Sequence, residues 1–268
     1  MIRTLKHIIF IILLGTTLFS CEKETSWDIQ PSGRFIVADC IITNEDKIQT
    51  LKLYYSSDSL NQLPEYISGA QAEITDGTKI YIFEEDTNSP GNYLSTQPFM
   101  ATAGNSYRLT VEYGDVHDTA WAEMATINPM ETLEIVKYDT LYRFVYNESS
   151  SPSMLDVSYD WSAVPGYCEA YGACTASETF YTLDIIDVSK EFAPDKLVIG
   201  FPRGTQIIRR KYSLSDKHQQ FIRAILLETE WRGGIFDTEQ GNVPTNFTGN
   251  IRGWFAACMV LSDTTNFD

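Results

Sequence analysis

Apolar and polar residues alternate in short runs along most of the chain. In one such run, Leu51 and Leu53 alternate with Thr50 and Lys52. A period of two residues is typical of β-strands, whose side chains point to opposite faces of a sheet. In the first half of the chain the pattern predicts strands at 34–43, 48–57, 70–76, 79–85, 92–96, 106–113 and 117–125.

Turn-forming pairs of residues separate these predicted strands. They are Asp76-Gly77, Pro90-Gly91, Gly104-Asn105 and Gly114-Asp115. Because the strands are short and closely spaced, we expect an Ig-like antiparallel β-sandwich over residues 34–128.

A second β-rich region is expected over residues 129–268. Its strands are predicted at 132–145, 154–162, 180–188, 196–201, 205–214 and 254–261. The fold class is therefore mainly all-β.

One helix interrupts this second region, at about residues 215–231. Ser213-x-x-Asp216 resembles a capping box, and Phe221, Ile222 and Leu226 recur at helical spacing. Since these apolar residues form one stripe, we expect the helix to pack against a sheet.

The first 20 residues have the features of a signal peptide. Arg3 and Lys6 precede an apolar segment, residues 8–19. A stable membrane-spanning helix needs about 20 apolar residues, so this segment is too short to span a bilayer. We therefore expect residues 1–20 to be removed.

The segment ends in Leu18-Phe19-Ser20-Cys21, which resembles the bacterial lipobox. The Cys21 thiolate would be acylated after cleavage at the small residue before it. This predicts attachment of Cys21 to outer-membrane lipid, with residues 21–33 as a tether. An ordinary secretory signal with a chance cysteine is the alternative.

The residues that follow Cys21 bear on location. Glu22-Lys23-Glu24 resembles the signals that send lipoproteins of Bacteroidota to the cell surface. We therefore expect the chain to be lipid-anchored in the cell outer membrane and to face the extracellular side.

The charge of the chain is strongly acidic, with 36 Asp and Glu residues against 20 Lys and Arg. Such a surface repels phosphate backbones. Nucleic acid is accordingly not expected as a partner.

Four further cysteines remain after Cys21. Cys168 and Cys174 bracket a short loop, and in an exported protein we expect a disulfide between them. Cys40 and Cys258 lie in apolar strands, where buried free thiols are expected. A bridge between those two would require the first and last strands to be neighbours.

Catalytic motifs are sparse. The sequence has no His-Glu-x-x-His, no Gly-x-Ser-x-Gly and no phosphate-binding Gly-Lys-Ser/Thr motif. His117 and His218 are expected at the surface, and the acidic loops 84–92 and 237–242 are expected to be turns rather than metal sites. We therefore assign no catalytic residue, metal or cofactor. Catalysis by a pair of carboxylates is the alternative, because such pairs have no fixed sequence spacing.

The order of these features resembles a known family. The lipobox, "FIVADCIITNE", "ATAGNSYRLTVEYGD", the late helix and "GNVPTNFTGNIRGWFAA" are similar to Bacteroidota lipoproteins known as domain of unknown function 4249. Members are often encoded beside TonB-dependent outer-membrane transporters. The resemblance implies an accessory lipoprotein of an uptake system.

Three functions are carried forward. The leading hypothesis is a non-enzymatic accessory or ligand-binding subunit of a TonB-dependent nutrient uptake system. The second is a surface glycan or peptide hydrolase that uses paired carboxylates. The third is an adhesin or surface-layer component.

Overall fold

The computed structural model describes residues 33–57, 62–185, 190, 193–231 and 243–268. Residues Arg34–Asp268 form one compact unit. The predicted signal peptide, Cys21 and the tether up to residue 32 lie outside the described residues.

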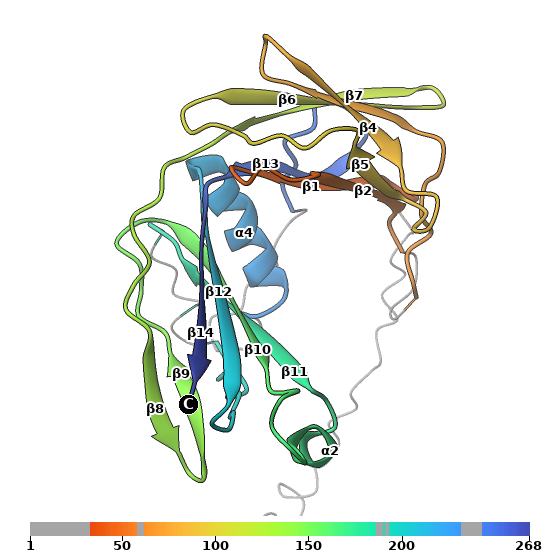
Figure 1. Ribbon diagram of the computed structural model, residues 1–268. Coiled ribbons are helices and arrows are strands. Elements are labelled where there is room, and N and C mark those ends of the chain that lie inside the picture. The colour runs from red at the N-terminus through yellow and green to blue at the C-terminus, as the bar shows by residue number, and fades with distance from the viewer. Residues whose placement is uncertain (1–32, 58–61, 186–189, 191–192, 232–242) are drawn as a thin grey trace, which may run out of the picture. The chain divides into compact units, whose positions relative to one another are not determined.

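The seven strands expected in the first half are present, and the mainly all-β fold class is confirmed. They join one eight-stranded sheet in the order β13-β1-β2-β5-β4-β3-β6-β7 (Figure 1). All neighbours pair antiparallel except β1 and β13, which are parallel. The strands are β1 (Ile36–Thr43), β2 (Thr50–Tyr55), β3 (Gln71–Thr75), β4 (Ile80–Glu85), β5 (Asn92–Ser95), β6 (Ser106–Tyr113), β7 (Val116–Glu123) and β13 (Arg252–Cys258).

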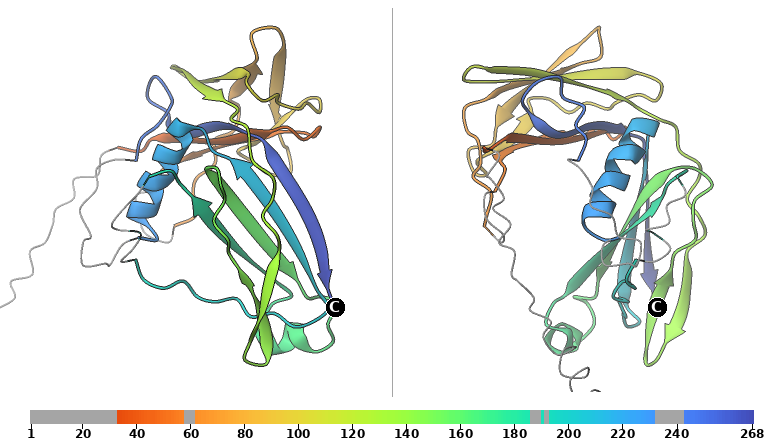
Figure 2. Two further views of the ribbon diagram at one scale, coloured as in Figure 1. Left: turned by 90° about the vertical axis from the view of Figure 1, so that its left-hand side faces the viewer. Right: turned by 180° about the vertical axis from the view of Figure 1, so that it is seen from behind.

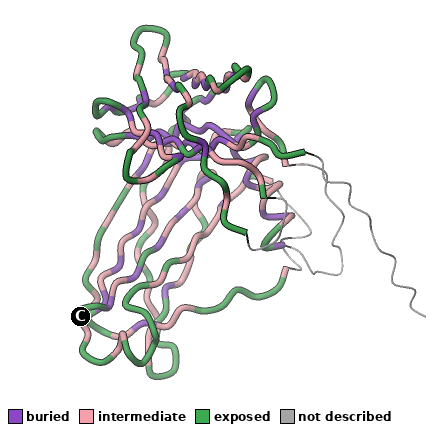
Figure 3. Tube along the Cα trace, turned by 90° about the vertical axis from the view of Figure 1, so that its right-hand side faces the viewer, coloured by how far each residue is buried: buried purple, intermediate pink, exposed green. Residues whose placement is uncertain are grey.

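This sheet is nearly closed, because its two edge strands approach each other. Ala125, just after β7, forms a bridge with Cys258, and Ala120 forms one with Phe247. Figure 2 shows from two further sides how the folded sheet lies above the remaining strands. The inward-facing side chains pack into one core, and buried positions alternate with exposed ones along the strands (Figure 3). The expected sandwich thus takes the form of a single sheet folded over its own core.

Strand β13 corrects the predicted division of the chain. Residues 252–258 were expected in the C-terminal region, but they form an edge of the sheet built from residues 36–123. The single strand expected at 254–261 is two strands, β13 and β14 (Val260–Phe267), which belong to different sheets. Periodicity predicts that a segment is a strand but carries no information about its partner.

The close approach of β1 and β13 depends on Gly253. Its φ is +98°, and a Cβ at this position would lie 2.1 Å from the carbonyl oxygen of Ala38. Only glycine has both the conformational freedom and the space for this contact.

A second sheet has the order β11-β10-β12-β14, and β8 and β9 form a separate hairpin. The strand expected at 196–201 is wrong, since only Phe201 forms a bridge there, with Tyr142. Only Phe201 and Ile199 of this apolar segment pack into the core of the second sheet, whereas Leu197 is 86 % exposed. These strands are β8 (Glu134–Tyr138), β9 (Leu141–Val145), β10 (Ser153–Asp160), β11 (Thr175–Thr182) and β12 (Thr205–Ser213).

The expected helix is α4, Asp216–Glu228. Its N-cap is Ser215, whose hydroxyl accepts the N–H of His218, and not Ser213, which is the last residue of β12. The ring of Phe221 stacks on Trp254 of β13 with centroids 4.7 Å apart. The helix therefore covers the outer face of β13, as its apolar stripe predicts.

Two ion pairs connect the parts of this unit. The buried ammonium of Lys211 in β12 lies 2.9 Å from both the Pro129 carbonyl and the Glu131 carboxylate. Arg210 pairs with Glu45 at 2.6 Å. Burial raises the pKa of Glu45, but hydrogen bonds and charges from Arg210 and Lys47 outweigh burial and lower that pKa to about 2.

Candidate ligand-binding site

A hollow of about 620 Å³ lies on the outer face of β3, β4, β6 and β7. We call it the outer groove. Its volume falls within the range of about 300–1,000 Å³ that ligand sites occupy. The side chains that define it are Gln71, Glu73, Ile82, Glu84, Arg108, Thr110, Glu112, His117 and Thr119.

Strand alternation and register place these side chains in rows. In β3, Ala72 and Ile74 face the core, so Glu73 faces outward. Register pairs Glu73 with Ile82 on one side and with Thr110 on the other. A side-chain row therefore runs across the strands, through residues that are far apart in the sequence.

The neighbouring row is acidic. Gln71 pairs with Glu112, which in turn pairs with His117 of β7. The carboxylate of Glu112 lies 2.8 Å from Nδ1 of His117, and both side chains are more than half exposed. Glu84 lines the same end of the outer groove. His117 is thus at the surface, as expected.

Two groove carboxylates have no ion-pair partner in the described part of the chain. Among the ion pairs of the described residues, none includes Glu73 or Glu84. Glu85 differs, because it accepts the main-chain N–H groups of Gly69 and Gly91, at 3.0 and 3.1 Å. Hydrogen bonds from Ser68 and these two N–H groups lower the pKa of Glu85. Glu85 holds loops, while Glu73 and Glu84 face the hollow.

The other end of the outer groove combines a cation with apolar side chains. The guanidinium of Arg108 lies over the ring of Trp121, 5.6 Å from its centroid. Register places Arg108 beside Trp121 and Thr75. The Nε–H of Arg108 is buried and has no acceptor in the described residues. An unpaired buried donor is costly, which makes it a group that a ligand can satisfy.

Apolar side chains on this face are unusually exposed. Ile80 is 61 % exposed, Ile82 46 % and Trp121 53 %. Single exposed apolar residues are common, but three on one sheet face beside a hollow are typical of a binding surface. The outer groove therefore offers carboxylates and the apolar side chain of Ile82, and the exposed side chains of Ile80 and Trp121 lie beside it on the same sheet face.

A smaller hollow of about 230 Å³ lies beside β9 and β11. Glu178 lines it and accepts a hydrogen bond from the hydroxyl of Tyr159. Burial raises the pKa of Glu178, against the effects of Tyr159 and Lys196. Glu178 is the only carboxylate among the described residues that line this hollow. It does not provide the carboxylate pair that the hydrolase hypothesis requires.

The comparison with known families covers the groove and almost all of the remaining chain. The model of a family described as Domain of unknown function (DUF4249) matches residues 22–264. The chain belongs to this family. No curated protein matches the chain.

The structure explains one sequence pattern of this DUF4249 protein, the Asn- and Gly-rich stretch before β13. Asn246 donates to the carbonyls of Trp121 and Phe255 and accepts the N–H of Phe255. It therefore joins β7 to β13 at the seam of the nearly closed sheet. The pattern has a structural role at this position.

Asp118 of β7 fastens the same stretch. Its side chain is 1 % exposed, and its carboxylate accepts the N–H groups of Gly249 at 2.7 Å and Ile251 at 2.9 Å. A Cβ on Gly249 would lie 2.8 Å from this carboxylate. The aspartate and the glycine are thus required together.

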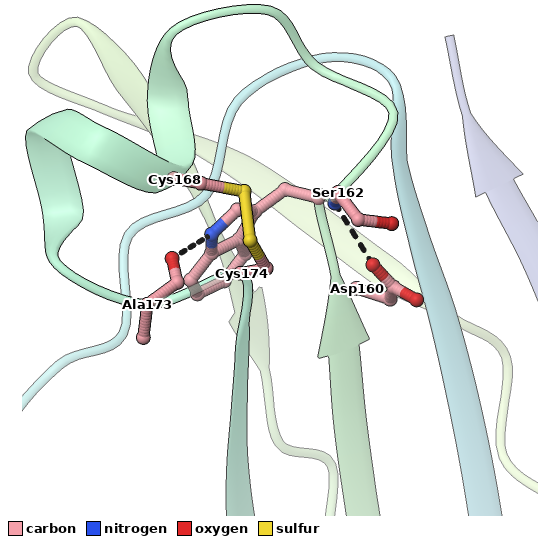
Figure 4. Close-up of a disulfide and its surroundings, with 6 residues drawn as sticks. Asp160, Ser162, Cys168, Ala173 and Cys174 are labelled. Atoms are coloured by element: carbon pink, nitrogen blue, oxygen red, sulfur yellow. Dashed lines mark hydrogen bonds between the residues drawn. A yellow bond between two sulfur atoms is a disulfide. The ribbon is translucent and has the colours of Figure 1, made fainter.

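The sulfur atoms of Cys168 and Cys174 are bonded in the DUF4249 structure, where the sequence predicts a disulfide (Figure 4). The loop between them contains a short helix, α2 (Tyr167–Tyr171). The indole N–H of the fully buried Trp161 donates to the Ala173 carbonyl at 2.7 Å. The loop is therefore fixed both covalently and by a buried ring.

Cys40 and Cys258 are buried free thiols. Their strands, β1 and β13, are neighbours, but Cys258 pairs with Thr43 and Cys40 with Phe255. Three residues along a strand separate Cα atoms by about 10 Å, beyond the reach of a disulfide.

His218 corrects an expectation, because it is buried rather than at the surface. Its ring stacks on Trp254, and its Nδ1 lies 3.8 Å from Sγ of Cys258. Burial raises the pKa of Cys258 to about 12 and lowers that of His218 to about 4. Both groups are therefore neutral near pH 7, whereas a nucleophilic Cys-His pair requires a thiolate.

Metal ligands do not cluster in the described part of the chain, where no group of three or more His, Cys, Asp or Glu residues could hold an ion. In the loop 84–92, Asp86 accepts the N–H of Asn88, as expected for a turn. The loop 237–242 lies outside the described residues. No helix in the described ranges is long and apolar enough to cross a membrane.

Proposed function

We propose that this DUF4249 protein is an outer-membrane lipoprotein, displayed at the cell surface. It serves a TonB-dependent nutrient uptake system as a non-enzymatic accessory or ligand-binding subunit. The observation that carries the binding role is the outer groove, with the carboxylates of Glu73 and Glu84 in its lining and the exposed side chain of Ile82 beside Glu73.

The anchor is Cys21, which follows Leu18-Phe19-Ser20. Each buried CH₂ of an acyl chain contributes about 0.8 kcal/mol, so two or three chains make attachment effectively permanent. Residues 22–33 follow the anchor, and a fully extended chain spans at most about 3.5 Å per residue. The folded unit would therefore stay within about 40 Å of the membrane.

The disulfide supports an exported location. Cys168 and Cys174 form their bond in a loop, and such bonds persist in oxidising compartments. A chain that is exported and permanently anchored works beside outer-membrane proteins, which suits an accessory subunit.

Co-purification tests this function. The full-length tagged chain is extracted from its native envelope in mild detergent, and co-purifying proteins are identified by mass spectrometry. We expect a TonB-dependent transporter in stoichiometric amounts. Its absence, with the lipoprotein intact, would refute the transporter role, and recovery of matrix or surface-layer material in its place would favour an adhesin.

Two variants control the anchor. Cys21→Ser should lose incorporation of labelled palmitate and leave the membrane fraction. Ser20→Ala keeps a small residue before the cysteine and should behave like the parent chain. Equal palmitate incorporation in both variants would contradict the assigned lipidation site.

A second candidate is the hydrolase, favoured by the presence of Glu73, Glu84 and Glu112 in one groove. Two carboxylates about 5–10 Å apart are what glycoside hydrolysis requires. Release of reducing ends from polysaccharide by the parent chain, lost in Glu73→Gln or Glu84→Gln, would support this candidate over the first.

A further inference from the structure

We infer that the outer groove binds an extended, basic polypeptide segment whose groove-facing side chains are basic and apolar in turn. This inference rests on the binding role proposed above and names the class of ligand.

Charge indicates a basic ligand. Glu73 and Glu84 face the hollow without a cation among the ion pairs of the described residues, and Glu112 is paired only with the imidazole of His117. Arg108, the one Lys or Arg side chain in the described lining, lies over Trp121. Lysine or arginine side chains of a ligand would supply the missing positive charge, and the acidic chain would attract them from a distance.

The apolar side chains of the outer groove indicate that the ligand carries apolar side chains as well as positive charge. Register sets Ile82 beside Glu73, so apolar and acidic side chains are adjacent in one row. An extended peptide points alternate side chains to opposite sides, and its successive side chains on one side lie about 7 Å apart. A segment whose groove-facing positions are basic and apolar in turn can therefore place a basic side chain on Glu73 and an apolar side chain on Ile82.

Arg108 indicates a ligand with hydrogen-bond acceptors. Its Nε–H is buried and has no acceptor among the described residues, so the Arg108 side chain would have to change its rotamer on binding to donate this N–H to a ligand. The main-chain carbonyls of a peptide provide acceptors at regular intervals, whereas a polyamine has none. A peptide thus matches three features of the outer groove: unpaired carboxylates, exposed apolar surface and an unpaired donor.

The test uses the full lipidated chain in a neutral detergent and a fluorescein-labelled peptide, Gly-Lys-Ser-Val-Ser-Arg-Ser-Val-Ser-Lys-Gly, in which the basic and Val side chains share one face of the extended chain. Fluorescence anisotropy measures its affinity. Two matched probes replace either every basic residue by Glu or every Val by Ser. We expect the basic, Val-containing probe to bind at least tenfold more tightly than either of them.

Double variants inside and outside the outer groove test whether the peptide binds there. Glu73→Gln combined with Glu84→Gln should weaken binding at least tenfold. The control, Glu169→Gln combined with Asp195→Asn, removes the same charge from exposed positions outside the groove and should leave the affinity within twofold. All four side chains face solvent at least in part, and matching thermal melts would show that both variants fold.

The possible results distinguish failure of the ligand class from failure of the proposed function. Equal weakening by both double variants would mean general electrostatic attraction and overturn the inference, as would spermine competing as well as the peptide. Failure of all probes while a transporter still co-purifies would refute the ligand class and leave the proposed function standing. Failure of both experiments would refute both.

Discussion

The carboxylate of Asp118 in β7 accepts the main-chain N–H of Ile251 at 2.9 Å, next to the start of β13. The same carboxylate accepts the N–H of Gly249 and the hydroxyl of Thr248. One buried side chain therefore joins the two edges of the nearly closed sheet, together with Asn246 and the main-chain bridges at this seam. A buried charge is tolerated because each of its oxygens has a donor.

Asp118→Asn should destabilise the fold by about 1–3 kcal/mol, because an amide NH₂ would face main-chain donors. Urea unfolding followed by tryptophan fluorescence measures this loss. Asp115→Asn, at an exposed turn in the same hairpin, should change stability by less than about 0.5 kcal/mol. Equal effects would contradict the role of Asp118 at the seam.

Lys211→Met should destabilise by about 3–5 kcal/mol. Methionine fills a similar volume but leaves the Glu131 carboxylate and the Pro129 carbonyl without their buried donor. The matched control is Lys217→Met, at an exposed position in the first turn of α4. If both variants unfolded at the same urea concentration, Lys211 would contribute nothing to the junction.

Stability should fall on mild acidification because of His218. An unfolded histidine has its ordinary pKa near 6.5, whereas burial lowers that of His218 to about 4. Between these values the unfolded chain binds a proton that the folded chain does not, so stability is lost as pH falls from about 6.5 to 4. The full contribution is about 3 kcal/mol.

His218→Phe should remove this part of the acid dependence, which unfolding at pH 7 and at pH 4 measures. His117→Phe serves as control, because His117 is exposed. An unchanged pH profile in His218→Phe would show that the imbalance in proton binding lies elsewhere, for example at Glu45.

Removal of the disulfide, by Cys168→Ser with Cys174→Ser, should destabilise by about 2 kcal/mol, the chain-entropy value for so short a loop. Reduction of the parent chain should have the same effect. In a Cys21→Ser chain unfolded without reductant, thiol titration should find Cys40 and Cys258 alone. Detection of all four remaining thiols would contradict the bond.

Gly253→Ala should prevent native pairing of β1 and β13, because the new Cβ would overlap the Ala38 carbonyl. We expect a loss of at least about 3 kcal/mol. Gly77→Ala, also at positive φ but with open space around it, should lose only about 1 kcal/mol. Thermal melts compare the two, and equal midpoints would show that the backbone angle alone matters.

The sequence predicts individual strands well where one face is buried, as for Leu51 and Leu53 in β2. The alternation pattern fails where the packing partners of a strand determine which of its faces are buried. Trp254 and Phe255 are both apolar because β13 packs on α4 and on the sheet core at once, a situation that no alternation predicts. The burial of His218 follows from this position of β13, so it was missed for the same reason.

The outer groove was not predicted at all. Glu73, Arg108 and His117 lie on three different strands, and nothing in their spacing connects them. Their proximity depends on the order β4-β3-β6-β7 and on its register. The alternation in each strand does identify the outward-facing residues, but these can be assigned to one groove only when the strand order is known.

The position of β13 and β14 at the end of the chain also affects when folding can finish. Each of the two larger sheets takes an edge strand from residues 252–267, and β1 waits for a partner encoded more than 200 positions later. Pairing across so much sequence is slow, since loop closure precedes any gain from contacts. If the chain is exported as proposed, we expect both sheets to remain incomplete until residues 252–267 have emerged, and an unfolded chain is the state that passage through a membrane requires.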